Sequence, residues 1–182
     1  MNFSLVTEDR LYKLNNKNHF LRESILLGCA FPTAANAIIN IAKVSKNSKV
    51  LIMGMGGLGY SSLIILNFLK CKNVTCIDVN NKRLKLLKNI KNFQFINTKS
   101  VQVMRNFISN NKDNFDLILD CTGSKSLIGR TFELCKKFSG KLIVIGNTKI
   151  KEKISINAWD IIFGKTLTGA WGRGGPLIKN FN

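Results

Sequence analysis

Short apolar runs alternate with helix-length segments of mixed polarity from residue 49 onward. The runs are rich in Ile, Val, Leu and Phe and lack strict apolar–polar alternation; they span 49–54, 73–79, 93–97, 115–123, 141–147 and 165–171. Such runs are typical of strands that are buried on both faces of a parallel sheet. The intervening segments predict helices over 58–69, 81–90, 100–110 and 124–138. Because the strand-to-helix connections are short, we expect an α/β fold: a doubly wound, mostly parallel six-stranded Rossmann sheet.

The first 28 residues have a different pattern. "FSLV" and "RLYKL" resemble two short strand pieces, "LRESILLG" resembles a short helix, and none of them has a layered partner in the sequence. We therefore expect this segment to be poorly packed or mobile. A further helix is expected over 33–42, with Pro32 at a position that the start of a helix tolerates.

Length and cysteine usage narrow the class of protein. A chain of 182 residues has room for one domain with a core and for a second small lobe. No apolar run approaches the roughly 18 residues of a membrane span, and the N-terminus lacks the order of a signal peptide, so a cytoplasmic protein without membrane contact is the expectation. The five cysteines form no C-x-x-C pair, which suits reduced thiols better than a disulfide framework.

The formal net charge of +18 allows two interpretations. One is a polyanionic partner such as nucleic acid. The other is a compositional excess of lysine, which is spread along the chain while arginine is scarce. No arginine or aromatic pattern of a known nucleic-acid module accompanies the lysines, so we expect no specific nucleic acid as partner. Non-specific adhesion to polyanions at low salt is expected in either case.

A glycine-rich turn follows the first predicted strand. Gly54, Gly56 and Gly59 satisfy G-x-G-x-x-G, with Gly57 as an additional small residue. The pattern is weak by itself, but here a predicted strand precedes it, a predicted helix follows, and Asp78 ends the next strand 19 residues after Gly59. The first glycine permits a tight turn, the second lets the backbone approach a pyrophosphate, and the third lets helix and strand pack closely. The motif therefore predicts a dinucleotide site.

The acid after the second strand bears on the choice of dinucleotide. Asp78 can accept hydrogen bonds from both hydroxyls of the adenosine ribose, whereas a 2′-phosphate would meet a like charge, so NAD(H) is favoured over NADP(H). Arg83 is close enough in sequence to lie beside that ribose, although a solvated helix charge is an equal interpretation. A structural glycine turn, or a site for flavin adenine dinucleotide or S-adenosylmethionine, remains an alternative.

With the glycine turn, three further segments carry a family resemblance. "LLGCAFPTAANAIINIAKVSKNSKVLIMGMGGLG" is similar to the medium-chain, zinc-dependent alcohol dehydrogenase superfamily, and "FDLILDCTG", "GKLIVIGN" and "GKTLTGAWG" are similar to the last three strands of its coenzyme domain. The resemblance covers nearly the whole chain. It implies a remnant of the N-terminal catalytic (GroES-like) lobe over 1–28 and an NAD(P)-binding Rossmann domain over 29–182, truncated at both ends relative to the family.

The resemblance also implies cofactor-binding roles. The positions of the pyrophosphate turn are Gly54, Gly56, Gly57, Leu58 and Gly59. Those that hold the adenosine ribose are Asp78 and Arg83, and those that line the adenine side are Cys121, Thr122 and Gly123. Those on the nicotinamide side are Thr33, Leu58, Ile145, Gly146, Ala170 and Trp171. The resemblance further implies that the edge strand over 165–170 pairs with its copy in a homodimer.

Cys29 matches the cysteine that ligates the catalytic zinc in zinc-dependent members of the superfamily. There the metal polarises the alcohol before hydride passes to the nicotinamide. Cys29 can equally be a small buried residue before a helix. The other ligands of the family lie in an N-terminal lobe beyond this chain, and the only histidine, His19, is more often a solvated loop residue in such a polar stretch. Asp116 and Asp120 are interpreted as structural.

These observations favour one function over two others. We expect the NAD(H)-binding domain of a zinc-type alcohol or polyol dehydrogenase, an oxidoreductase that is inactive alone because the catalytic lobe is missing; that lobe can be supplied by a separate polypeptide. The alternative is a non-catalytic NAD-binding or scaffold module. A basic nucleic-acid-associated protein is a weaker alternative.

Overall fold

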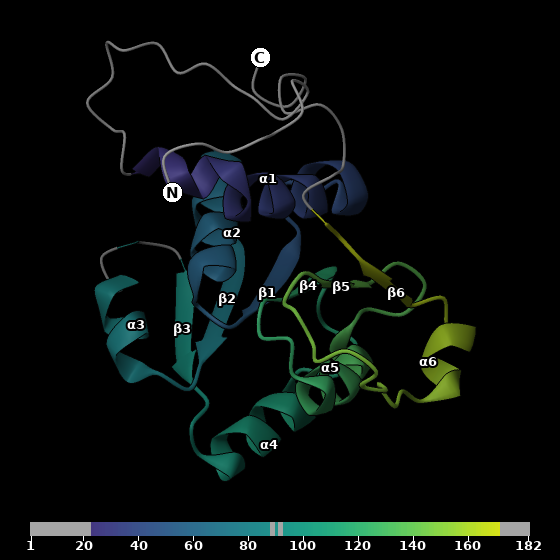
Figure 1. Ribbon diagram of the computed structural model, residues 1–182. Coiled ribbons are helices and arrows are strands. Elements are labelled where there is room, and N and C mark those ends of the chain that lie inside the picture. Colours follow the sequence, from purple (N-terminus) through teal and green to yellow (C-terminus); the bar gives the residue numbers. More distant parts are fainter. Residues whose placement is uncertain (1–22, 88–89, 91–92, 172–182) are drawn as a thin grey trace.

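The computed structural model describes residues 23–87, 90 and 93–171 of the chain (Figure 1). Within them, six strands form one sheet in the order β3-β2-β1-β4-β5-β6, and every pairing is parallel. The strands are β1 (Lys49–Met53), β2 (Asn73–Asp78), β3 (Phe93–Asn97), β4 (Leu117–Asp120), β5 (Lys141–Val144) and β6 (Thr166–Gly169). This strand order is that of the doubly wound dinucleotide-binding fold. The predicted fold class is confirmed.

Nine helical elements are described alongside the sheet. The α-helices are α1 (Ala30–Ala35), α2 (Gly57–Phe68), α3 (Asn81–Leu87), α4 (Val101–Asn110), α5 (Lys125–Thr131) and α6 (Ala158–Ile162). The elements η2 (Glu23–Gly28) and η4 (Phe132–Leu134) are 3₁₀ helices, and η3 (Asn36–Ala42) is a π-helix that continues α1. The two strand pieces expected near the N-terminus lie outside the described residues, as does most of the segment expected to be poorly packed.

Helices cover both faces of the sheet, and the central strand shows why its sequence does not alternate. Val50 and Ile52 of β1 belong to a cluster with residues of α1, η3, α2 and α3, whereas Leu51 and Met53 belong to a second cluster with residues of α4, α5 and η4. All four side chains are fully buried. Because successive strand residues point to opposite faces, a strand covered on both sides is apolar throughout.

The helix expected over 33–42 begins three residues earlier, at Ala30. Pro32 therefore lies inside the first turn, where a missing N–H removes no intrahelical hydrogen bond. The second half of the predicted helix is the π-helix η3, which ends at Lys43 in the left-handed conformation (φ 55°). Local pattern indicated a helix here but not its start or its type.

The helix expected over 124–138 is too long by several residues. α5 ends at Thr131 and is followed by η4. After η4 the chain runs beside the start of β4, where the N–H of Lys136 donates to the carbonyl of Phe115 (2.8 Å). A tertiary hydrogen bond thus replaces the continuation of the helix. The structure also contains α6, which the sequence reasoning missed. The start of this helix does carry a sequence signal: the side-chain oxygen of the N-cap residue Asn157 accepts the N–H of Trp159 (3.0 Å), and Asp160 lies in the first turn.

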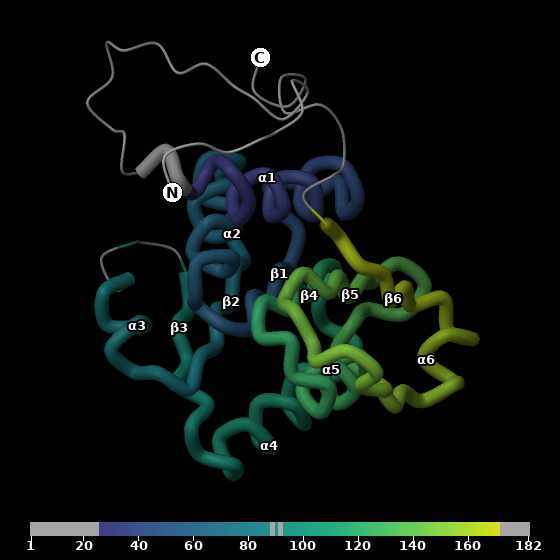
Figure 2. Tube along the Cα trace, viewed as in Figure 1, coloured from purple at the N-terminus to yellow at the C-terminus, as the bar shows by residue number. Residues whose placement is uncertain are grey.

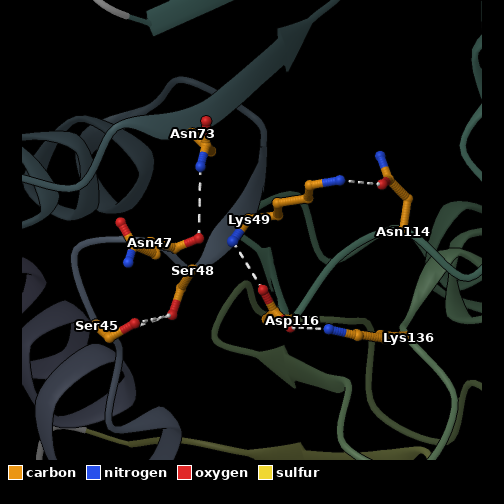
Figure 3. Close-up of polar contacts among 8 residues, drawn as sticks. All are labelled: Ser45, Asn47, Ser48, Lys49, Asn73, Asn114, Asp116 and Lys136. Atoms are coloured by element: carbon orange, nitrogen blue, oxygen red, sulfur yellow. Dashed lines mark hydrogen bonds and ion pairs between the residues drawn. The ribbon is translucent and has the colours of Figure 1, made fainter.

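Asp116 lies at the amino edge of the sheet, opposite to the glycine turn. One carboxylate oxygen accepts the backbone N–H of Lys49 (2.9 Å), and the other lies 3.4 Å from Nζ of Lys136 (Figure 3). The ammonium group of Lys49 in turn donates to the side chain of Asn114 (3.0 Å). These contacts hold the starts of β1 and β4 together, which agrees with the structural interpretation of Asp116.

The cysteines of the described residues are all free thiols, and burial makes three of them poor nucleophiles. Cys71, Cys76 and Cys135 are buried. Burial raises the pKa of the Cys76 and Cys135 thiols to about 12, so their thiolates are scarce at neutral pH. Among the described helices, none has the length and apolarity to span a bilayer.

A charged cluster lies at the start of the edge strand β6, which follows α6 in the chain (Figure 2). The side chain of Lys165 is only 1% exposed, and its Nζ lies 2.7 Å from a carboxylate oxygen of Asp113 and 2.7 Å from one of Asp160. The same ammonium group donates to the backbone carbonyl of Glu133 (2.8 Å). We call Lys165, Asp113, Asp160 and the Glu133 carbonyl the Lys165 cluster.

The charges of this cluster lower the pKa of Asp113 and raise that of Lys165. Burial alone raises the pKa of Asp113, but hydrogen bonding and the charge of Lys165 outweigh it, so that pKa lies below its ordinary value of 3.8. Burial alone lowers the pKa of Lys165, but its two carboxylate partners leave that pKa above its ordinary value of 10.5. The ion pairs therefore stabilise the fold between these values, and their contribution is lost as the pH falls through the lowered pKa of Asp113.

We predict that Asp113→Asn lowers the free energy of unfolding by about 2 kcal/mol at neutral pH, because the buried ammonium loses a charged partner. Asn tolerates the positive φ of this position (53°), so the backbone stays unstrained. The difference from wild type should begin to shrink as the pH falls below about 4, where the carboxylate of the unfolded chain takes up a proton, and should be lost once the pH is below the lowered pKa of the folded Asp113. Urea unfolding at several pH values measures it, with Glu152→Gln, which removes the ion pair with the half-exposed Lys125, as the control. An equal difference at pH 3 and pH 7 would contradict the prediction.

Candidate dinucleotide-binding site

The turn between β1 and α2 requires two of its glycines for packing. Gly54 has a φ of +89°, and a Cβ there would lie 2.8 Å from the side chain of Thr122. A Cβ on Gly59 would lie 2.0 Å from the carbonyl oxygen of Gly54. The first glycine therefore permits the turn, and the third lets α2 pack directly on the end of β1.

The other two glycines face open space. A Cβ on Gly56 or Gly57 would meet no atom within 4 Å. Gly56 is the N-cap of α2 and makes no side-chain cap, so the N–H groups of the first helical turn are left for a ligand. A helix N-terminus favours negative charge, and the absence of side chains lets a phosphate approach the backbone. The turn thus fits a pyrophosphate.

Asp78, at the end of β2, binds the same turn. Its Oδ2 accepts the backbone N–H of Met55 (2.7 Å), and its Oδ1 accepts that of Asn80 (2.7 Å). Arg83 Nη1 lies 3.5 Å from Oδ2, and the Asp78 side chain is 4% exposed. The carboxylate therefore stabilises the glycine turn through hydrogen bonds to its backbone. Sequence reasoning missed this structural role. Oδ2 also accepts from Arg83, whereas Oδ1 accepts only the N–H of Asn80 among the described residues and has a lone pair for a further hydrogen bond.

A pocket of about 460 Å³ lies between the glycine turn, α2 and α3. It is lined by Met55, Gly56, Gly57, Tyr60, Arg83, Leu86 and Leu87. Arg83 thus lines the pocket. Sequence reasoning missed Tyr60, Leu86 and Leu87; Tyr60 follows the last glycine directly, and the leucines lie one turn after Arg83 on α3, which is the signal that could have found them.

The loops after β4 and β5 meet beside the turn. Asp120 is fully buried, and its carboxylate accepts the N–H and the O–H of Thr122 and the N–H of Gly123. Burial raises the pKa of Asp120, and these hydrogen bonds oppose that effect. A Cβ on Gly146 would lie 2.5 Å from the nitrogen of Gly123, so the two loops pack backbone to backbone. Asp120 is structural, as expected, and Cys121 lies in the same turn.

The remaining assigned residues extend the site along the carboxyl edge toward β6. The N–H of Ala170 donates to the carbonyl of Val144 (3.1 Å), which brings Ala170 beside Ile145. Both belong to the apolar cluster that includes residues of α1, the helix that carries the buried Thr33. Trp171 is 75% exposed. The predicted residues of β1, β2, β4, β5 and β6 thus lie at the carboxyl edge of one parallel sheet, where ligands of this fold bind.

A family model for zinc-binding dehydrogenases matches residues 57–181, which is more than half of the chain. The chain belongs to the zinc-binding dehydrogenase family. S-(hydroxymethyl)glutathione dehydrogenase of Saccharomyces cerevisiae is 27% identical over 173 residues, covering 88% of this chain and 45% of the relative. Geraniol dehydrogenase of Carpoglyphus lactis is 24% identical over 164 residues, covering 90% and 43%. The chain spans less than half the length of these relatives.

Solved structures of dehydrogenases have the same fold. Benzyl alcohol dehydrogenase of Acinetobacter calcoaceticus matches with a TM-score of 0.77 at 24% identity, covering 90% of this chain and 45% of the other. An E. coli alcohol dehydrogenase in complex with NADH matches with a TM-score of 0.72 at 17% identity, covering 87% and 46%. A zinc-binding dehydrogenase of Sinorhizobium meliloti bound to NADP matches with a TM-score of 0.66 at 16% identity, covering 78% and 43%.

The described residues of this zinc-binding dehydrogenase domain do not form a metal site. Cys29 is exposed and lies at the N-cap of α1. Across the part of the chain that the structure describes, no group of three His, Cys, Asp or Glu side chains could hold a metal ion. His19 lies outside the described residues. A zinc ion needs about four ligands, of which three or more come from the protein, so Cys29 alone does not meet the requirement.

We predict that Gly59→Ala lowers the free energy of unfolding by about 3 kcal/mol, because its Cβ would overlap the Gly54 carbonyl and force α2 away from β1. Gly56→Ala is the matched control: its Cβ enters open space, and the cost should stay below about 1 kcal/mol. Urea denaturation of the two variants measures the difference. Equal destabilisation would contradict the packing role of Gly59.

Proposed function

We propose that this domain binds NAD(H) as the coenzyme-binding half of an alcohol-dehydrogenase-type oxidoreductase. The observation that carries the proposal is the pocket at the open N-terminus of α2, which Arg83 lines and behind which the carboxylate of Asp78 accepts the N–H of the lining residue Met55. It combines backbone N–H groups for a pyrophosphate with an acid for a ribose, in a member of a dehydrogenase family. Bound NAD(H) would supply the hydride acceptor or donor of the reaction.

Different residues of the chain would bind the adenosine half and the nicotinamide half of the coenzyme. Gly56, Gly57 and Leu58 offer the first-turn N–H groups to the pyrophosphate, while Asp78 accepts from the adenosine ribose. Thr122 and Gly123 lie in the turn beside Gly54 and form the wall on the adenine side. On the other side, the nicotinamide lies along the carboxyl ends of β5 and β6, at the positions that the family resemblance assigned to it: Thr33, Leu58, Ile145, Gly146, Ala170 and Trp171.

The preference for NAD(H) rests on the charge of Asp78. Membership of the family leaves this choice open, because similar structures contain NADH in one case and NADP in another. In this chain the carboxylate is nearly buried, with an arginine that is 53% exposed at 3.5 Å. A 2′-phosphate at this place would face the carboxylate at close range, and the partly solvated arginine offsets that repulsion only in part.

Catalysis requires more than the described residues provide. We infer that hydride transfer needs a catalytic lobe, because the relatives are more than twice as long as the part that this chain matches. A second candidate function is a non-catalytic NAD-binding module. Metal content and activity with an added lobe discriminate between the two.

A homodimer through β6 also remains a proposal. β6 is the last strand of the sheet order, and Thr166 and Gly169 are exposed. An edge strand with free backbone groups can pair with its copy across a twofold axis. The charged Lys165 takes no part in such a pairing, because its side chain lies inside the domain. Sedimentation of the purified chain measures the oligomeric state.

We predict that the purified chain binds NADH with saturation, more tightly than NADPH, and that raised salt does not abolish the binding. Asp78→Asn should weaken NADH about tenfold, the loss of one charged hydrogen bond, and should reduce the discrimination against NADPH. Calorimetric titration measures both affinities. Gly56→Ala should also weaken NADH while the fold stays stable, and Glu152→Gln should change neither affinity. Unchanged affinity and selectivity in Asp78→Asn would refute the proposed role of the acid.

We further predict that the purified chain contains far less than one zinc ion per molecule after exposure to zinc and dialysis, because Cys29 lacks partner ligands among the described residues. Atomic emission of the dialysed protein measures the ratio, and Cys29→Ser should not change it. Stoichiometric zinc that is lost in Cys29→Ser would instead support a metal site that the described residues alone do not form.

A further inference from the structure

Among the described strands, the edge strand β6 is paired on one side only, with β5. Thr166 and Gly169 are exposed, and Leu167 and Thr168 are only half-buried. Side chains alternate between the two faces, so a slip of two residues would return each side chain to the same face of the sheet. Such a slip would move the strand by about 7 Å. Because backbone pairing with β5 can form in either register, contacts outside the strand bear on which register is adopted.

The Lys165 cluster supplies the missing constraint immediately before the strand begins. The ammonium group of Lys165 lies 2.7 Å from Asp113 and 2.7 Å from Asp160, with a side chain that is 1% exposed. A buried ammonium without these partners would carry an unpaired charge, which is strongly unfavourable. A slip of β6 would draw Lys165 away from Asp113 and from the carbonyl of Glu133, which belong to distant segments of the chain. One register is therefore favoured over its neighbours.

The partners of Lys165 are themselves fixed to other parts of the domain. The N–H of Asp113 donates to the carbonyl of Glu133 (3.2 Å), which joins the segment before β4 to η4. Asp160 belongs to α6, and its carbonyl accepts the N–H of Lys165 (3.1 Å). The cluster thus ties β6, and α6 that leads into it, to two distant segments: the one before β4 and η4. Polar groups that select one register are known from other folds.

The register of β6 decides what lies at its far end. Val144 pairs with Gly169, and the next residue, Ala170, donates its N–H to the carbonyl of Val144 (3.1 Å) beside Ile145. We propose that Lys165 is a positioning residue for the nicotinamide half of the site: its ion pairs hold β6 in the register that brings Ala170 next to Ile145. Five steps of extended chain, about 17 Å, separate Lys165 from Ala170, so Lys165 does not touch the coenzyme. The inference rests on the proposed NAD(H)-binding function.

The adenosine half does not depend on the cluster. The pocket beside the glycine turn is lined by residues of β1's end, α2 and α3, and no member of the Lys165 cluster is among them. In the sheet order, β4 and β5 lie between β1 and β6. Loss of the cluster should therefore affect the two halves of the coenzyme unequally, which a general loss of stability would not.

The test compares two ligands on the full chain. NADH contains both halves of the coenzyme, whereas ADP-ribose lacks the nicotinamide. In Lys165→Met, calorimetry should show NADH affinity reduced about tenfold, to that of ADP-ribose, while ADP-ribose affinity changes less than about twofold. The emission of bound NADH should also return toward that of the free coenzyme. The matched control is Lys136→Met, which removes an exposed ammonium from Asp116 and should change neither affinity.

Each outcome of this experiment is decisive. Equal weakening of NADH and ADP-ribose in Lys165→Met means that the cluster serves stability alone, and unchanged affinities mean that β6 keeps its register without it; either result overturns the proposal. If Lys165→Met does not fold, Asp160→Asn removes one partner and keeps the Asp113 pair, and a smaller loss confined to NADH is expected. Wild-type protein that binds neither ligand overturns the proposed function, and this inference with it.

Discussion

The close approach of α2 to the end of β1 is the constraint on which the rest of the site depends. It is possible only because Gly59 has no side chain to strike the carbonyl of Gly54. With the helix in this position, its N-terminus points to the carboxyl edge of the sheet, at the place where the strand order reverses between β1 and β4. Asp78 then braces the turn from β2 by accepting the N–H of Met55.

The few acids of this basic chain are concentrated in structural contacts. The sequence contains 10 acidic and 28 basic residues. Each of the five aspartates of the described residues binds a backbone N–H or a lysine or arginine of the fold: Asp78, Asp113, Asp116, Asp120 and Asp160. Most of the described lysines have no such partner in the described part of the chain. The large net charge is therefore carried by solvated lysines, which favours the compositional interpretation over a specific polyanion site.

The two halves of the proposed coenzyme site are held in different ways. The adenosine half is built from glycines and backbone hydrogen bonds around β1, in the most buried part of the sheet. The nicotinamide half depends on an edge strand, on the loop at Gly146, which packs against the Gly123 loop of the adenine side, and on a buried ion cluster at a distance. In the longer relatives, further chain is present that this domain does not match. The second half is thus the one in which distant contacts matter.

The sequence by itself determined the strands, their parallel arrangement and the dinucleotide turn. These features depend on neighbours in the chain: buried strands are apolar runs, and the glycine turn and Asp78 are separated by one helix and one strand. Tertiary structure alone decided the early end of α5, the bond from Asp78 to Met55 and the Lys165 cluster. Asp113 and Lys165 are 52 positions apart. The carbonyl that accepts the N–H of Lys136, beyond the end of α5, belongs to Phe115. Hydrogen bonds and ion pairs between distant segments leave no periodic pattern, so only the folded chain brings their partners together.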